Sequence, residues 1–109
     1  MKRTPERKRR NRRPLARVRR VLHARLPELR TQYDVRTLGI FGSYVRGEQR
    51  PGSDVDVLVE FGDHGPSLLG FVRLENTLSD LVGKKVDLVE RSGLKPRIGA
   101  HILEEVVPV

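Results

Sequence analysis

The sequence has no cysteine and no tryptophan, and its aromatic residues are three phenylalanines and two tyrosines. The absence of cysteine excludes a disulfide framework, a thiolate metal site and a cysteine nucleophile. No apolar run approaches the roughly 20 residues that a membrane-spanning helix needs. The N-terminal stretch also lacks the apolar segment and cleavage site of a secretory signal. We therefore expect a cytoplasmic protein without membrane contact, with room in 109 residues for one domain.

Charge is distributed unevenly along the chain. Residues 1–20 contain 11 Lys/Arg and one Glu, a net charge of +10, whereas the other 89 residues contain 11 Lys/Arg and 13 Asp/Glu, a net charge of −2. Because a block of like charges repels itself, we expect residues 1–13 to form a disordered basic arm and residues 14–109 a single domain. The arm is interpreted either as a contact for nucleic acid or an acidic partner, or as a solvated tail.

Apolar periodicity predicts three main helices. The first starts at Pro14 and has apolar residues at helical spacing, and we expect Pro27 to end or kink it. The second starts at Pro66 and ends near Gly83, and a short last helix starts at Pro96. The apolar face predicted for the second helix consists of Leu68, Leu69, Val72, Leu74, Leu78, Leu81 and Val82.

Three apolar segments predict strands: TLGIFG at 37–42, DVDVLVEF at 54–61 and KVDLVE at 85–90. Between the first two we expect one helical turn, with Ser43 as its N-cap and Gly47 at its end. The order of these elements predicts a small α/β (α+β) domain. It would contain a mixed β-sheet of three to four strands flanked by helices.

Two aspartates are spaced one residue apart on the second predicted strand. Residues i and i+2 of a strand point to the same face, so Asp54 and Asp56 would project together. A divalent cation would relieve their repulsion, and Mg²⁺ commonly takes one or two carboxylates, with phosphate and water completing its coordination. Asp87 lies in the third strand in the same pattern, and three acids on adjacent strands suit a two-metal site. The alternative is that Asp54 caps a turn and Asp56 faces solvent.

A glycine–serine turn precedes these acids. A strand that ends at Gly42-Ser43 and turns into a helix offers backbone N–H groups and a hydroxyl to phosphate oxygens. Glycine also permits a positive φ and the close approach of a phosphate. Arg46, one turn later, would face phosphate or fix the loop by pairing with a carboxylate. The strand, the turn and the paired acids together indicate a site for a metal-bound polyphosphate.

This combination resembles the minimal nucleotidyltransferases of the DNA polymerase β superfamily. The resemblance runs from about Leu38 to the end of the sequence, about two-thirds of the chain, and excludes the basic arm. It is carried by Gly42-Ser43, Arg46-Gly47 within a ten-residue spacer, Asp54-Val55-Asp56, Asp87 and the closing segment LKPRIGAHILEEVVPV.

The resemblance implies transfer of a nucleoside monophosphate from an NTP, with release of pyrophosphate. Asp54 and Asp56 would ligate two Mg²⁺ ions, and Asp87 would complete the second metal site and help to deprotonate the acceptor. Gly42 and Ser43 would hold the β- and γ-phosphates, with Arg46 as a further nucleotide-binding or structural residue. Single-domain members resemble the antitoxin of two-protein modules, which adenylylates a tyrosine of a HEPN-type ribonuclease toxin. ATP would be the donor.

Three other functions remain open from the sequence. The first is an antitoxin that masks its toxin by binding alone. The second is a small-molecule nucleotidyltransferase of the aminoglycoside-modifying type, although such enzymes usually carry a further helical domain. The third is a nucleic-acid-binding module that uses the arm at 1–13 and would bind with steep salt dependence. We expect His23 and His101 to be surface side chains, His64 to lie in a loop within possible reach of substrate, and Tyr44 to pack.

Overall fold

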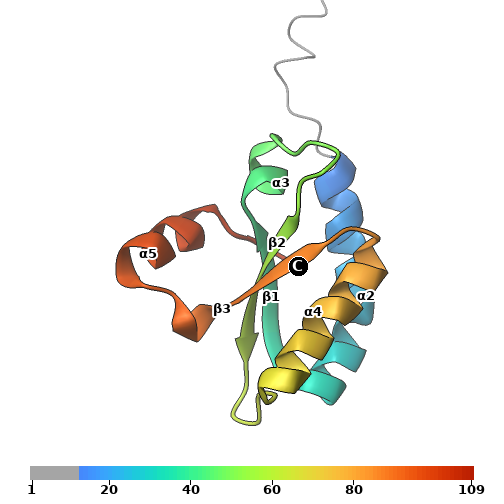
Figure 1. Ribbon diagram of the computed structural model, residues 1–109, viewed down its shortest axis with the longest axis vertical. Helices are drawn as coiled ribbons and strands as arrows, with labels where there is room; N and C mark the ends of the chain where they lie inside the picture. Colours follow the sequence, from blue (N-terminus) through green and yellow to red (C-terminus); the bar gives the residue numbers. More distant parts are fainter. Residues whose placement is uncertain (1–12) are drawn as a thin grey trace, which may run out of the picture.

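The computed structural model describes residues 13–109 (Figure 1), and it confirms the predicted α/β class with a mixed sheet flanked by helices. Apart from Arg13, the predicted basic arm lies outside the described residues. The elements are α2 (Arg13–Tyr33), β1 (Val35–Phe41), α3 (Ser43–Arg46), β2 (Val55–Phe61), α4 (Leu68–Val82), β3 (Val86–Glu90), a 3-10 turn η1 (Arg91–Gly93), α5 (Pro96–Glu105) and β4 (Val107–Pro108).

The sheet has the strand order β3-β2-β1-β4. β1 is antiparallel to β2 and to β4, whereas β2 and β3 are parallel and are joined by the crossover helix α4. Figure 1 shows α2 and α4 side by side against one face of the sheet, with α5 on the other side. Val55, Val57 and Val59 of β2 are completely buried toward α2 and α4, and so the intervening residues of β2 face the α5 side. Among residues 13–109, no helix combines the length and apolarity required to cross a membrane.

Helix α2 passes through Pro27, so this proline does not end the first helix, which was one of the two outcomes expected for it. The buried stripe that holds α2 on the sheet continues to either side of the proline. Pro27 itself lies on the exposed side, where water can hydrate the carbonyl that loses its N–H partner. The stripe consists of Leu15, Val18, Leu22, Leu26 and Leu29.

Helix α4 buries only part of its predicted apolar face. Leu74, Leu78 and Val82 are buried, but Leu68, Leu69 and Val72 are 81%, 60% and 43% exposed. The prediction was wrong for these three because it allowed too broad a stripe. Leu69, for example, precedes Leu78 by about two and a half turns and points away from the sheet. The helix begins after Ser67, whose hydroxyl accepts a hydrogen bond from the Gly70 N–H at 3.2 Å.

Strand β3 forms one edge of the sheet, and α4 covers the N–H groups of that edge with polar side chains. The Val86 N–H donates to the Ser79 hydroxyl, and the Leu88 N–H donates to the Glu75 carboxylate, both at 2.9 Å. These two bonds flank Asp87 on either side. They therefore fix the strand at the position that presents Asp87, and they protect an edge that would otherwise offer unpaired donors.

Candidate functional site

Two of the predicted acids are brought side by side by the parallel pairing of β2 and β3. Asp56 is the register partner of Asp87, and Phe41, the last residue of β1, is the antiparallel partner of Asp56. Asp56 is half-buried and Asp87 is exposed. Asp54 immediately precedes β2, in the segment that enters the strand. The ends of three structural segments therefore converge on the face of the sheet opposite α2 and α4.

The electrostatics of Asp56 reflect this convergence. Burial raises the pKa of Asp56 above its ordinary value of 3.8, and the charges of Asp87 and Asp54 raise it further. Glu105 acts in the same direction, whereas the Arg46 guanidinium lowers the pKa. The site thus holds an excess of negative charge that a cation would neutralise.

The turn after β1 places its backbone against the same carboxylate. Gly42 has φ 79°, and a Cβ at this position would overlap the Asp56 carboxyl group, so only glycine fits. Gly42 is also the N-cap of α3, and Ser43 is the first helical residue; the expectation that Ser43 caps this turn is therefore wrong. The positive φ at the boundary, which serine adopts with strain, explains the difference. Gly47 ends α3 in the left-handed conformation, as expected.

Glu105, the last residue of α5, closes the turn from the other side of the site. The Gly42 N–H donates to Glu105 Oε2 at 2.7 Å, and Arg46 donates from its guanidinium to Glu105 Oε1 at 2.6 Å. Arg46 also bonds Glu48 at 2.9 Å. The two carboxylates, Glu48 first, raise the pKa of Arg46 above its ordinary value. Arg46 thus fixes the loop by pairing with carboxylates, which was one of the two roles expected from the sequence.

Glu105 is the main residue of the site that sequence patterns did not single out. It lies 63 residues from Gly42, and a glutamate near the end of an amphipathic helix has the appearance of an ordinary surface residue. Gln49 Oε1 is the one buried side-chain atom without a hydrogen-bond partner among the described residues. No signal in the sequence pointed to it.

The carboxylates of this site suit a cation that binds together with a nucleotide better than a metal ion that is bound permanently. Among residues 13–109, no three or more His, Cys, Asp or Glu side chains are grouped as a preformed metal site. Asp56 and Asp87 are nevertheless neighbours in register, and their repulsion is visible in the raised pKa of Asp56. One or two carboxylates are enough for Mg²⁺ when phosphate oxygens and water complete its coordination.

The histidines are not grouped with these acids as a metal site among residues 13–109. The backbone of His64 follows the far end of β2, where its N–H donates to Asp34 at 2.6 Å. The His23 ring bonds the backbone carbonyl of Val109 at 3.1 Å, and His101 is exposed on α5. The Tyr44 ring is buried in the core, as expected.

The sequence matches the Nucleotidyltransferase domain family over residues 24–109. The chain belongs to this family. It is 52% identical over 89 residues to the protein adenylyltransferase MntA of Thermococcus cleftensis, a match that covers 82% of this chain and 89% of the relative. The chain is therefore a nucleotidyltransferase, and its resemblance to the minimal nucleotidyltransferases is confirmed.

Solved structures of the family share the fold. A candidate minimal nucleotidyltransferase superposes with a TM-score of 0.68 at 38% identity, covering 86% of this chain and 90% of the other. The MNT antitoxin in complex with a tri-AMPylated HEPN toxin of Shewanella oneidensis gives a TM-score of 0.57. At 16% identity, with 87% of this chain and 70% of that chain covered, the second likeness is one of fold alone.

Proposed function

We propose that this nucleotidyltransferase is a protein adenylyltransferase of the cytoplasm. It would move AMP from ATP, with Mg²⁺, onto a tyrosine hydroxyl of a partner HEPN-type ribonuclease toxin and thereby act as the antitoxin. The observation that carries the proposal is the register pairing of Asp56 with Asp87 beside the Gly42 turn. The name of the 52% identical relative supports the choice of AMP and of a protein acceptor.

Ser43 is the residue of the turn best placed to hold phosphate. The Gly42 N–H already donates to Glu105, so Gly42 contributes a close backbone approach and a positive φ. The Ser43 hydroxyl has no hydrogen-bond partner among residues 13–109, and it can donate to a phosphate oxygen. Arg46 and Glu105 keep the turn in this conformation, which makes them positioning residues.

The aspartates divide the chemistry between them. Asp54 and Asp56, together with Asp87, would hold two Mg²⁺ ions, which when bound neutralise the triphosphate and the charge that develops on the leaving pyrophosphate. Asp87 is exposed, so an acceptor hydroxyl could reach it. It would take the proton of the tyrosine hydroxyl as that oxygen bonds to the α-phosphorus and the bond to pyrophosphate breaks.

The test uses ATP labelled at the α-phosphate, Mg²⁺ and the protein that co-purifies with the chain from its native host. Wild-type chain should transfer the label to that protein, and Asp54→Ala with Asp56→Ala should reduce the rate at least about a thousandfold, because positioning and charge neutralisation are the main sources of catalysis. Asp63→Ala with Asp80→Ala is the matched control, since both residues are exposed and lie outside the site.

Label that persists in the double variant would contradict the proposal. An antitoxin that acts by masking alone would give a different result: the Asp54→Ala/Asp56→Ala variant would still protect cells from the toxin as well as wild type does. Protection by the Asp63→Ala/Asp80→Ala control, with loss of protection in the site variant, supports transfer as the protective activity.

A further inference from the structure

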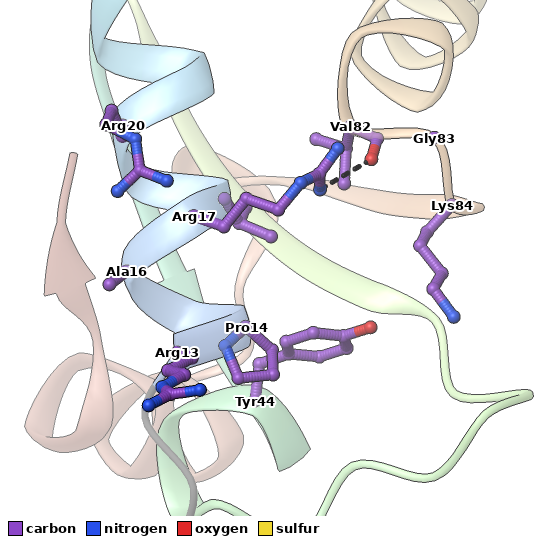
Figure 2. A pocket seen from close by; sticks show the side chains of 10 residues that line it. Arg13, Pro14, Ala16, Arg17, Arg20, Tyr44, Val82, Gly83 and Lys84 are labelled. Atoms are coloured by element: carbon purple, nitrogen blue, oxygen red, sulfur yellow. Dashed lines mark hydrogen bonds between the residues drawn. The ribbon is translucent and has the colours of Figure 1, made fainter.

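A cavity lies on the helix side of the sheet, next to the basic first turns of α2. It has a volume of about 700 Å³, within the range of ligand pockets in general. Figure 2 shows its walls, formed by the start of α2, by α3 and by the junction between α4 and β3. The lining residues are Arg13, Pro14, Ala16, Arg17, Val18, Arg20, Tyr44, Val82, Gly83 and Lys84.

The charges around this cavity are all of one sign. Arg13, Arg17 and Arg20 share one face of α2 at helical spacing, Lys84 lies across from them, and no acidic residue of the described range 13–109 is part of the lining. Arginines at the start of a 21-residue helix also add to the positive end of its dipole, and α2 has no acidic residue in its first turn to offset them. An anionic ligand would reduce the repulsion between these cations and would interact favourably with the positive end of the helix dipole.

Two of the cations are held in place around the opening. Arg17 donates to the carbonyl of Val82 at 2.9 Å (Figure 2), and Lys84 donates to the carbonyl of Pro51 at 3.1 Å. Each keeps further N–H donors beyond the one used. Arg20 is exposed at the rim. The cavity therefore presents oriented donors rather than freely moving side chains.

Tyr44 adds a neutral hydrogen-bond donor to the lining. The residue is only 4% exposed, and its hydroxyl has no hydrogen-bond partner among residues 13–109. Figure 2 shows the ring beside Pro14, with the hydroxyl on the side where Lys84 lies. The hydroxyl is not among the buried side-chain atoms of residues 13–109 that lack a partner, so it is open to the cavity and can donate to an acceptor there.

We propose that this cavity binds an acidic segment of the protein that accepts the adenylyl group, a partner identified by the proposed function. Carboxylates of the segment would pair with Arg20, Lys84 and the Tyr44 hydroxyl, and its apolar side chains would pack on Pro14 and Ala16. Single-stranded nucleic acid fits less well, because the one aromatic ring of the lining is buried and cannot stack on a base. Tyr44 lies two residues after Gly42, so a partner held here is close to the nucleotide turn.

Binding is tested without nucleotide or metal, so the result does not depend on catalysis. A fluorescein-labelled peptide of alternating glutamate and leucine is titrated with the full chain and followed by anisotropy. Arg20→Glu with Lys84→Glu should weaken binding at least about tenfold, and Tyr44→Phe about threefold to tenfold. Arg36→Glu with Arg73→Glu changes the net charge equally at exposed positions outside the cavity, and should have a much smaller effect.

Equal losses in the cavity and control variants would overturn the proposal, because net charge alone would then explain binding. Tighter binding of oligouridylate that is lost in the same cavity variants would also overturn it, in favour of nucleic acid. With the labelled-ATP assay, Arg20→Glu/Lys84→Glu should raise the KM for the acceptor protein and leave kcat unchanged. Failure of the proposed function would appear differently, as peptide binding by a wild-type chain that transfers no label.

Discussion

Ionisation of Asp56 destabilises the folded state relative to the unfolded state. Its carboxyl group is half-buried, lies against the Gly42 backbone and is surrounded by the charges of Asp87, Asp54 and Glu105. The raised pKa means that the folded state favours the protonated form more than the unfolded state does. This loss of folding stability is absent below the ordinary carboxylate pKa, where Asp56 is protonated in both states. It is complete above the raised pKa of the folded state, and so it acts fully at neutral pH.

Asp56→Asn should therefore abolish transfer and yet stabilise the protein in the absence of metal. In EDTA at pH 7 we expect a higher Tm for the variant than for wild type, and a difference that shrinks as the pH is lowered toward 4. Added Mg²⁺ with ATP should raise the Tm of wild type much more than that of the variant. A variant less stable than wild type at pH 7, with no convergence on acidification, would contradict this account of Asp56.

Glu105 should matter through the turn that it holds. Glu105→Ala removes the acceptor of the Gly42 N–H and the partner of Arg46, and we expect a loss of about 1–3 kcal/mol in unfolding free energy and about a tenfold fall in kcat/KM for ATP. Glu105→Gln keeps an acceptor oxygen and should lie between this variant and wild type. Glu104→Ala, at the exposed neighbouring position, is the control; equal effects at the two positions would exclude a specific role for Glu105.

At the scale of elements, the edge strand β3 depends on helix α4 for its position. Ser79 and Glu75 accept hydrogen bonds from the two N–H groups that flank Asp87. The same helix provides the crossover between the parallel strands, so packing and edge protection come from one element. Asp87 is thus held in position by two side chains of α4.

Ser79→Ala should leave the buried Val86 N–H without a partner. We expect the free energy of unfolding in urea to fall by about 1–3 kcal/mol, and the transfer rate to fall through displacement of Asp87. Asn76→Ala, on the exposed side of α4, should change neither quantity. The role assigned to the strand edge is wrong if the two variants unfold at the same urea concentration.

Local patterns were sufficient to predict most elements of the fold. The valines of β2 alternate with the period of a strand, and Gly47 and Gly83 end their helices in the left-handed conformation. Sequence patterns failed at positions whose structure depends on whether the residue faces the sheet or solvent. Pro27 is tolerated because it faces solvent, and Leu69 is exposed because the sheet covers only one side of α4.

At the scale of the whole molecule, the site combines near and distant residues of the chain. Gly42, Ser43, Asp54 and Asp56 fall within 15 positions, so their spacing was visible in the sequence. The pairing of Asp56 with Asp87 required only that two predicted strands be neighbours. Glu105 could not be found in this way, because its contact with Gly42 depends on how α5 returns to the sheet.

Because the turn is held by the hydrogen bond between Gly42 and Glu105, it should open at a rate different from that of global unfolding. Gly99 is the one buried residue of α5, so this helix should detach from the sheet far more often than the whole chain unfolds. The amide of Gly42 should then exchange its hydrogen with solvent on the order of a hundredfold faster than that of Ile40 in the central strand β1. Glu105→Ala should remove the remaining protection at Gly42. Amide exchange at this single glycine would thus report directly how often the last helix releases the Gly42 turn.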